Sequence, residues 1–462
     1  MTSLTVWAGR HAVGHLSHDP GTNRFAFAYT DEWARLRNAF PLCPQLPIRQ
    51  DEISSEQHSA IVRQFFENLL PEGEALDHAA QVNGISKSNL IGLALALGRE
   101  TAGAIRLSAG DTPPSEPEVL REIGRPELSQ RIADRTKEPF SVWDGQVRLS
   151  IAGHQDKIAV YEHERRLYLV NGGLRASTVI VKPVPARPQL AALPGNEFLC
   201  MKLARAAGLP VADVWLEYLP QPVLFVRRFD RLERQEAVDR LHMIDGCQAL
   251  GLSVGMKYER PYGDKPDVRE IRDGASLRLL FEAINKYSVQ PVVDRMALLR
   301  WAIFQVLIGN CDAHGKNVSF FVSPGGLVLA PTYDLVCIPA LEDAKLDRTL
   351  AMAIGDAFTA GEITPFDWAQ LGRQAGMRMA AMAKQMQDLA KKTLYGLDAA
   401  IDEATQAGVP KEESGRVQAY VVAACQAVAD AAKNVAKVDP NTSQSAQVAP
   451  ATDGAPQSPA RD

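Results

Sequence analysis

The stretch Ile308-Gly309-Asn310-Cys311-Asp312-Ala313-His314-Gly315-Lys316-Asn317 decides how this chain is expected to fold. Asp312 and Asn317 stand in it with four residues between them, which is the Asp-x-x-x-x-Asn spacing of a kinase catalytic loop. In so tight a loop, the carboxylate reaches the hydroxyl that attacks phosphorus, and the amide turns back toward a magnesium ion on the nucleotide phosphates. The apolar run 301–308 precedes the loop and the alternating run 318–322 follows it, so two buried elements are expected to hold it.

The spacing alone is common in chains of this length, and a turn or helix-capping role for Asp312 explains it equally well. A second signal lies at Asp334, which closes the next β-type segment. Kinases place their second metal-binding carboxylate at this point of the chain. Asp312, Asn317 and Asp334 on adjacent loops would form an all-oxygen magnesium site.

The region before the catalytic loop supplies candidates for a nucleotide site. Residues 146–160 are two β-type runs around a small-residue turn, which suits backbone N–H groups laid over phosphates, although an ordinary hairpin is the simpler interpretation. Lys182 ends an apolar strand, like the phosphate-pairing Lys of kinases; an edge-strand charge is the alternative. Glu197 opens the next helix and is placed to pair with that Lys. Strands at 213–218 and 222–227 then lead toward a hinge.

Composition narrows the class of protein. The 462 residues are 46% apolar with a net charge of −5 and no long basic run, so a free-standing nucleic-acid binder is disfavoured. The six cysteines are scattered without a Cys-x-x-Cys pair, which argues against a zinc site or a disulfide framework. The first residues lack a signal-peptide pattern, and the longest apolar run, 90–97, is too short to cross a bilayer. These features predict a soluble, cytoplasmic protein.

The predicted organisation is α+β and two-lobed. Residues 1–105 are expected to form a small α+β subdomain, and the polar, Pro-rich stretch 106–135 is expected to be a surface connection. Residues 106–245 would make a β-rich lobe and 246–437 a helical lobe that contains the catalytic loop. Residues 438–462 are Pro, Ala, Ser, Gln and Thr with almost no apolar bulk, which predicts a disordered tail.

Taken in order, these signals resemble the HipA toxin kinases of bacterial type II toxin–antitoxin systems, over roughly residues 3–435. The stretches that carry the resemblance are Phe65–Pro71, Leu149–Lys157, Cys247–Gly251, Met256–Glu259, Asp312–Asn317 and Tyr333-Asp334. The resemblance implies a two-lobed, protein-kinase-like fold that transfers the γ-phosphate of ATP to a protein Ser or Thr.

The resemblance also implies roles for individual residues. Asp312 would be the catalytic base, Asn317 and Asp334 would hold Mg²⁺, and Ser150 would be a self-inactivating autophosphorylation site. Glu197 would support Lys182 through an ion pair. The implied ATP-binding residues are Ala152, Gly153, His154, Gln155, Asp156, Lys157, Lys182, Arg227, Arg228, Phe229, His314, Lys316, Asn317 and Tyr333.

The implied partners are a small helix-turn-helix antitoxin, operator DNA bound through that antitoxin, and an aminoacyl-tRNA synthetase as the protein substrate, so that activity halts translation and growth. The chain departs from the family at Arg227, where the best-known member has an acidic residue, and at His154, which replaces a small residue. Two other functions stay open: a small-molecule kinase on the same scaffold, and an inactive kinase-like protein that acts with the antitoxin as a co-repressor.

Overall fold

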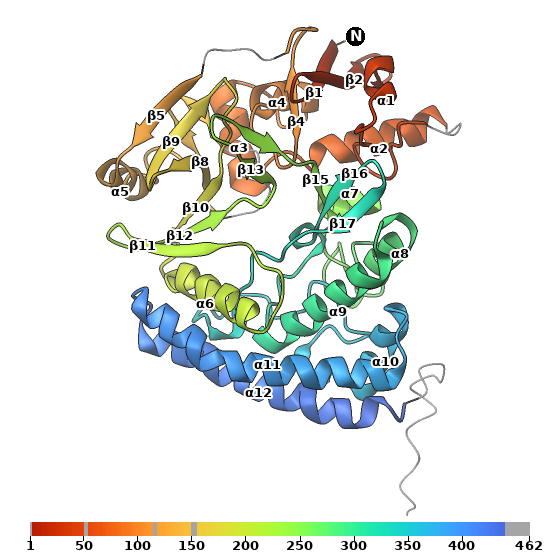
Figure 1. Cartoon of the computed structure of the whole chain (residues 1–462), viewed down its shortest axis with the longest axis vertical. Helices are drawn as coiled ribbons and strands as arrows, with labels where there is room; N and C mark the ends of the chain where they lie inside the picture. The colour runs from red at the N-terminus through yellow and green to blue at the C-terminus, as the bar shows by residue number, and fades with distance from the viewer. Residues whose placement is uncertain (1, 50–53, 114–117, 149–154, 439–462) are drawn as a thin grey trace, which may run out of the picture.

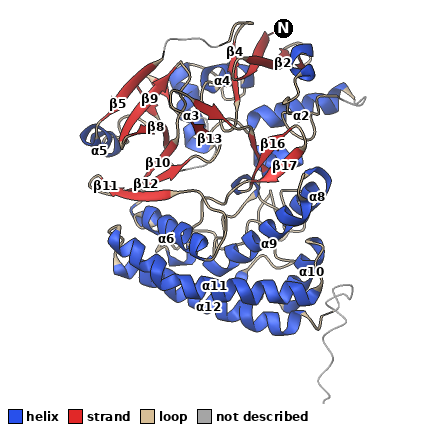
Figure 2. Ribbon diagram, viewed as in Figure 1, coloured by secondary structure: helices blue, strands red, loops and turns tan. Residues whose placement is uncertain are grey.

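The computed structural model describes residues 2–49, 54–113, 118–148 and 155–438. Figure 1 shows two regions stacked along the long axis, with the sheets above and a helical layer below that contains α6, α9, α11 and α12. Figure 2 shows the same division by secondary structure, with nearly all strands in the upper region. The α+β, two-lobed prediction is confirmed.

A four-stranded antiparallel sheet, in the order β3-β2-β1-β4, is the centre of the N-terminal subdomain. Its strands are β1 (Thr2–Ala8), β2 (His11–Asp19), β3 (Arg24–Tyr29) and β4 (Ile105–Ser108). Its helices are α1 (Asp31–Arg35), α2 (Ser55–Glu67), α3 (Gly73–Asn83) and α4 (Leu90–Leu97). The Ser54 hydroxyl caps α2, whose buried residues Val62, Phe65 and Phe66 pack into the core beneath the sheet. Because β4 pairs with β1, this sheet extends to Ser108, past the predicted boundary at 105.

A six-stranded antiparallel sheet, in the order β11-β12-β10-β8-β9-β5, forms the second part of the upper region. Its strands are β5 (Val119–Ile123), β8 (Ile158–His163), β9 (Arg166–Asn171), β10 (Val179–Pro183), β11 (Val214–Tyr218) and β12 (Pro222–Arg227). Around it lie α5 (Arg125–Ala133), the short pair β6 (Val142–Trp143) and β7 (Gln146–Val147), and the pair β13 (Arg231–Glu233) and β14 (Val238–Arg240). Helix α6 (Leu193–Ala206) packs against β11 and β12 on one side and against α11 on the other.

The helical region carries a three-stranded sheet, β15-β16-β17, on its upper side. The strands are β15 (Met243–Asp245), β16 (Ser319–Ser323) and β17 (Gly326–Leu329). The helices are α7 (Gly246–Leu250), α8 (Leu277–Tyr287), α9 (Pro291–Ile308), α10 (Pro365–Gln374), α11 (Met379–Gln406) and α12 (Lys411–Val435). The long helices α11 and α12 lie side by side at the base in Figure 1 and carry α9 above them. No helix in the described ranges is both long and apolar enough to cross a membrane.

Two expectations about the region before the site are wrong. Residues 106–135 are not merely a connection, because β5 adds an edge strand to the six-stranded sheet and α5 buries Leu128 and Ile132 one turn apart. The run 146–160 is not one hairpin: β7 pairs with β6, while β8 pairs with β9 and β10. β5 is an edge strand with polar residues, so its sequence lacks the apolar pattern of a buried strand. Which short apolar runs pair with each other depends on contacts between segments far apart in the chain. The apolar run 301–308 lies in α9, directly before the catalytic loop, as expected.

Candidate functional site

The catalytic loop begins where α9 stops. Gly309 ends the helix in the left-handed conformation (φ 67°), and its N–H donates to the carbonyls of Gln305 and Val306. The loop then carries Asp312, one of whose carboxylate oxygens, Oδ1, accepts a 2.7 Å hydrogen bond from the Tyr258 hydroxyl. Asn317 Nδ2 donates to the main-chain oxygen of Asp312 at 2.9 Å, so the amide oxygen of Asn317 is the atom left to face a ligand. The two ends of the Asp-x-x-x-x-Asn motif are therefore joined directly.

Asp334 lies in the loop after β17 and has a left-handed backbone, with φ at 57°. A non-glycine residue in this region is uncommon and is held there by its surroundings. Two contacts do so: Asn310 Nδ2 donates to the Asp334 main-chain oxygen at 3.2 Å, and Lys182 Nζ contacts the carboxylate at 2.7 Å. The catalytic loop and the Asp334 loop are thus fixed to each other.

Lys182 on β10 is the centre of a three-charge cluster. Its ammonium lies 2.7 Å from Asp334 Oδ1 and 2.7 Å from Glu197 Oε1 on α6. Burial opposes the charge of Lys182, but the two carboxylates outweigh burial and raise its pKa. Burial raises the pKa of Glu197 to about 6, whereas Lys182 overcomes the burial of Asp334 and lowers the pKa of that carboxyl to about 2. The expected Lys182–Glu197 pair is present, and it extends to Asp334.

The second lysine of the candidate nucleotide site, Lys157, precedes β8 and is buried. Burial, and after it the charge of Lys182, lower the pKa of Lys157 to about 8, against the opposing carboxylates of Asp334, Glu72 and Glu197. Gln155 Nε2 donates to the main-chain oxygen of Pro183 at 3.3 Å.

Asp156 is partly buried, and this burial raises the pKa of its carboxyl. Ser150, Ala152, Gly153 and His154 lie outside the described residues.

Two pairs of rings lie next to residues of the site: Tyr333 with Phe229, and Tyr258 with His314. Tyr333 donates its hydroxyl to the Lys316 main-chain oxygen at 2.7 Å, and its ring centroid lies 5.7 Å from that of Phe229 at the hinge. His314 is buried with its ring 5.2 Å from that of Tyr258. Burial and the charge of Lys257 lower the pKa of His314 to about 3, so its imidazole is neutral at physiological pH.

Three side chains proposed for ATP binding point elsewhere. The Lys316 ammonium is buried and donates hydrogen bonds to Asn68 and Asp245. The Arg228 guanidinium is buried and donates to Glu100, Asp230, Ser177 and Thr101. Arg227 pairs with Glu162 and Glu233 at 2.9 Å each. The guanidinium groups of Arg227 and Arg228 are therefore engaged within the protein, and their main-chain N–H groups also donate to the oxygens of Asp213 and Thr178.

Sequence reasoning missed Tyr258 and Asn310 as members of the site. Tyr258 lies 54 positions before its partner Asp312, so no local spacing connects them. Asn310 stands inside the quoted loop, but its partner is a main-chain oxygen 24 positions away. Only the fold brings either pair together.

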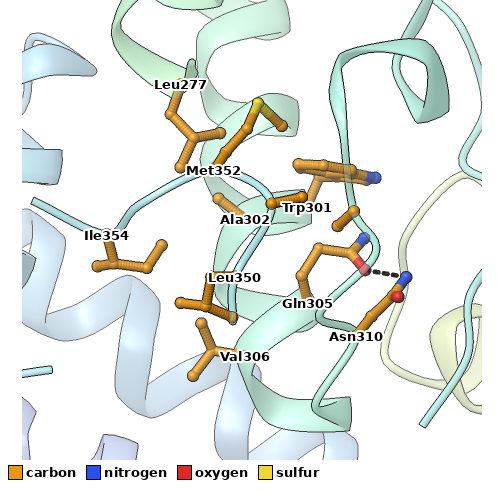
Figure 3. Close-up of a pocket in the computed structure, with 11 residues that line it drawn as sticks. Leu277, Trp301, Ala302, Gln305, Val306, Asn310, Leu350, Met352 and Ile354 are labelled. Carbon is orange, nitrogen blue, oxygen red and sulfur yellow. Dashed lines mark hydrogen bonds between the residues drawn. The ribbon is translucent and has the colours of Figure 1, made fainter. Parts of the chain in front are cut away.

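A small apolar cavity lies behind the catalytic loop (Figure 3). Trp301, Ala302 and Val306 of α9 line it together with Leu350 and Met352. Figure 3 shows Gln305 and Asn310 at its polar edge, where Asn310 Nδ2 also donates to Gln305 Oε1 at 2.9 Å. None of the side chains that line this cavity is charged, so it is separate from the charged groups of the site.

The donor set suits a hard cation. In the described ranges no three His, Cys, Asp or Glu side chains gather as a metal site. The carboxylate of Asp334 and the amide oxygen of Asn317 are instead the kind of sparse oxygen set that Mg²⁺ uses when it keeps several waters and binds phosphates. Asp334 is held ionised and Asn317 Nδ2 is already engaged, so both present oxygens as a magnesium–nucleotide ligand requires.

Two family models match this chain: the HipA N-terminal domain over residues 4–108 and the HipA-like C-terminal domain over 149–397. The serine/threonine-protein kinase toxin HipA of Shewanella oneidensis is 37% identical over 84% of this chain and 87% of its own length. The putative kinase Y4mE of Sinorhizobium fredii is 33% identical over 84% of this chain and 90% of its own length.

A solved complex of Shewanella oneidensis HipA with HipB and operator DNA contains a chain that superposes with a TM-score of 0.81 at 33% identity. That match covers 94% of this chain and 100% of the other. With both family models matched in order and the fold shared over nearly the whole length, this chain belongs to the HipA family.

Proposed function

We propose that this chain is an ATP- and Mg²⁺-dependent serine/threonine-protein kinase and the toxin of a type II toxin–antitoxin pair. The observation that carries the proposal is the cluster in which Lys182 contacts both Glu197 and Asp334 at 2.7 Å. A buried lysine fixed between a helix carboxylate and a metal-loop carboxylate is the arrangement that an active kinase needs to orient nucleotide phosphates.

Five residues of the site would have parts in phosphoryl transfer: Lys157, Lys182, Asp312, Asn317 and Asp334. Lys182 and Lys157 supply positive charge to the phosphates, and Asp334 and Asn317 would hold Mg²⁺, which neutralises charge on the transferred group. Asp312 orients the attacking Ser or Thr hydroxyl and accepts its proton. One of its carboxylate oxygens accepts a hydrogen bond from the Tyr258 hydroxyl, which orients the carboxylate.

The partners follow from the relatives. The Shewanella chain was solved with HipB and operator DNA, which supports a HipB-like helix-turn-helix antitoxin as the partner here. The net charge of −5 gives this chain little attraction of its own for DNA, so operator affinity should come from the antitoxin. We propose an aminoacyl-tRNA synthetase as the substrate, growth arrest with persistence as the outcome, and phosphorylation of Ser150 as self-inactivation.

Phosphoproteomics after induction tests the kinase, with wild type compared with Asp312→Asn. The expected result is phosphorylated Ser or Thr, including one on a synthetase, in wild type alone. Asp356→Asn is the control, because Asp356 is an exposed partner of Arg272. Transfer by Asp312→Asn at the wild-type rate would refute the assignment of the base. Phosphate found only on a metabolite would favour a small-molecule kinase, and binding of antitoxin without any transfer would favour the inactive co-repressor.

Self-inactivation has its own test. Incubation with Mg²⁺ and ATP should add phosphate at Ser150 and lower later activity, because about −1.5 to −2 charges beside the phosphate loop compete with ATP for its donors and lysines. Ser150→Ala should block both changes. An active preparation whose mass spectrum shows unmodified Ser150 would remove this part of the proposal.

A further inference from the structure

The segment Asn68–Glu72 of the N-terminal subdomain follows α2 and leads into α3. No catalytic role was expected from the sequence for any residue of this subdomain. Asn68 and Glu72 are only 4% and 7% exposed, although both are polar and neither lies on a strand. Burial of such groups is costly unless they are paired, so their partners identify what the segment does.

Asn68 reaches one side of the catalytic loop. Its side-chain oxygen and main-chain oxygen accept hydrogen bonds from Lys316 Nζ at 2.8 and 3.1 Å. Its Nδ2 donates to the main-chain oxygens of Gln64 and Leu252 at 2.8 and 2.9 Å, which fixes the amide in this orientation. Lys316 immediately precedes Asn317, whose own amide donates to the Asp312 main-chain oxygen.

Glu72 reaches the other side of the loop. Its carboxylate pairs with Lys257 Nζ at 2.7 Å, and both side chains are 7% exposed. The main-chain oxygen of Lys257 accepts from the Gly315 N–H of the catalytic loop at 2.9 Å. The next residue, Tyr258, donates its hydroxyl to the Asp312 carboxylate.

The two contacts therefore converge on one residue. Asn68 acts through Lys316 and Asn317 on the main chain of Asp312, and Glu72 acts through Lys257 and Tyr258 on its side chain. We propose that the segment Asn68–Glu72 completes the active site, because it positions the catalytic loop from both sides. Asn68, Glu72 and Lys257 are positioning residues in this proposal: they act on Asp312 through Lys316 and Tyr258. This inference rests on the proposed kinase function and extends it to the N-terminal subdomain.

Two variants of the full-length chain separate positioning from mere stability. Asn68→Leu removes the side-chain acceptor of Lys316 and keeps the branched shape of the side chain. The double variant Glu72→Met with Lys257→Met replaces both members of the buried ion pair by apolar groups, a change that buried pairs often tolerate in stability.

Two matched controls accompany these variants. Glu67→Gln alters the residue just before Asn68. Glu67 pairs with Arg63 on the surface of the same helix. Asp294→Asn removes the charge of a carboxylate that is only 1% exposed. Asp294 lies near the start of α9, at the opposite end of that helix from the catalytic loop.

Hydrogen exchange of the amides in residues 310–317 is the first measurement, and it needs no kinase activity. In both variants the Gly315 and Asn317 amides should exchange at least about tenfold faster than in wild type, because local opening of the loop becomes easier. Both controls should match wild type in this segment. Unchanged exchange in Asn68→Leu and in the double variant would overturn the inference.

Steady-state kinetics is the second measurement. Misplacement of Asp312 should lower kcat by at least about tenfold, and this loss should exceed any rise in KM for ATP, because Lys182 and Asp334 are untouched. Asp294→Asn should lower the melting temperature and leave kcat unchanged. Faster exchange with an unchanged kcat would overturn the inference. A wild-type chain that transfers no phosphate would refute the proposed function, and the exchange rates would still decide whether the segment holds the loop.

Discussion

Substitution of Asp334 by Asn tests the charge cluster at the centre of the site. Asn has the shape of Asp and is among the residues that tolerate a left-handed backbone, so the φ of 57° adds no new strain. What changes is the charge that Lys182 contacts at 2.7 Å. The substitution therefore isolates electrostatics from geometry.

The expected loss of stability follows from the pKa of the carboxyl. Lys182 lowers the pKa of Asp334 from 3.8 to about 2, which corresponds to roughly 2 kcal/mol at neutral pH. Because the side chain is 36% exposed, solvent screening reduces this to about 1–2 kcal/mol. A carboxyl whose pKa is lowered in the folded state stabilises the fold above its unfolded pKa, and this contribution is lost as pH falls from 3.8 toward 2.

Urea denaturation at pH 7 measures that loss, and calorimetric titration with ATP measures binding with and without Mg²⁺. Asp334→Asn should unfold with about 1–2 kcal/mol less free energy and bind Mg²⁺–ATP at least about tenfold more weakly. Metal-free ATP should bind it no more weakly than wild type, since a negative charge has been removed. Asp356→Asn, an exposed carboxylate, serves as the control. Equal Mg²⁺ enhancement of ATP binding in Asp334→Asn and wild type would refute the assignment of Asp334 as a metal ligand.

Three further predictions follow from the same structure. Asp312→Asn should bind Mg²⁺–ATP within about threefold of wild type in a calorimetric titration while losing transfer, because its carboxylate faces the substrate hydroxyl; a parallel loss of binding would contradict this. ATP affinity of wild type should fall between pH 7 and 9 as Lys157, with its pKa near 8, loses its charge. Lys157→Arg should flatten that profile, and an identical profile in both would exclude Lys157. Glu100→Gln should cost about 2–3 kcal/mol in urea denaturation, because the guanidiniums of Arg240, Arg231 and Arg228 outweigh burial and lower the pKa of Glu100 from 4.5 to about 2; full retention of stability would contradict that pairing.

The resemblance places Arg227 and Arg228 among the implied ATP-binding residues. In the structure, Arg228 pairs with Glu100 of the N-terminal subdomain and with Asp230, two positions further along the chain. Charge alone does not reveal whether an arginine faces a ligand or another part of the chain.

The sequence by itself determined the parts whose physical signal is local. The spacing of Asp312 and Asn317, the lysine at the end of a buried strand, and the apolar run 301–308 of α9 all lie within short windows, and the structure has each of these elements in place. Only the tertiary structure decided the remainder. The edge strand β5, the contact of Tyr258 with Asp312, the tie from Asn310 to Asp334, and the burial of Lys316 on Asn68 all join positions far apart in the chain. Such contacts depend on which surfaces the completed core brings together, and no local pattern of residues specifies that.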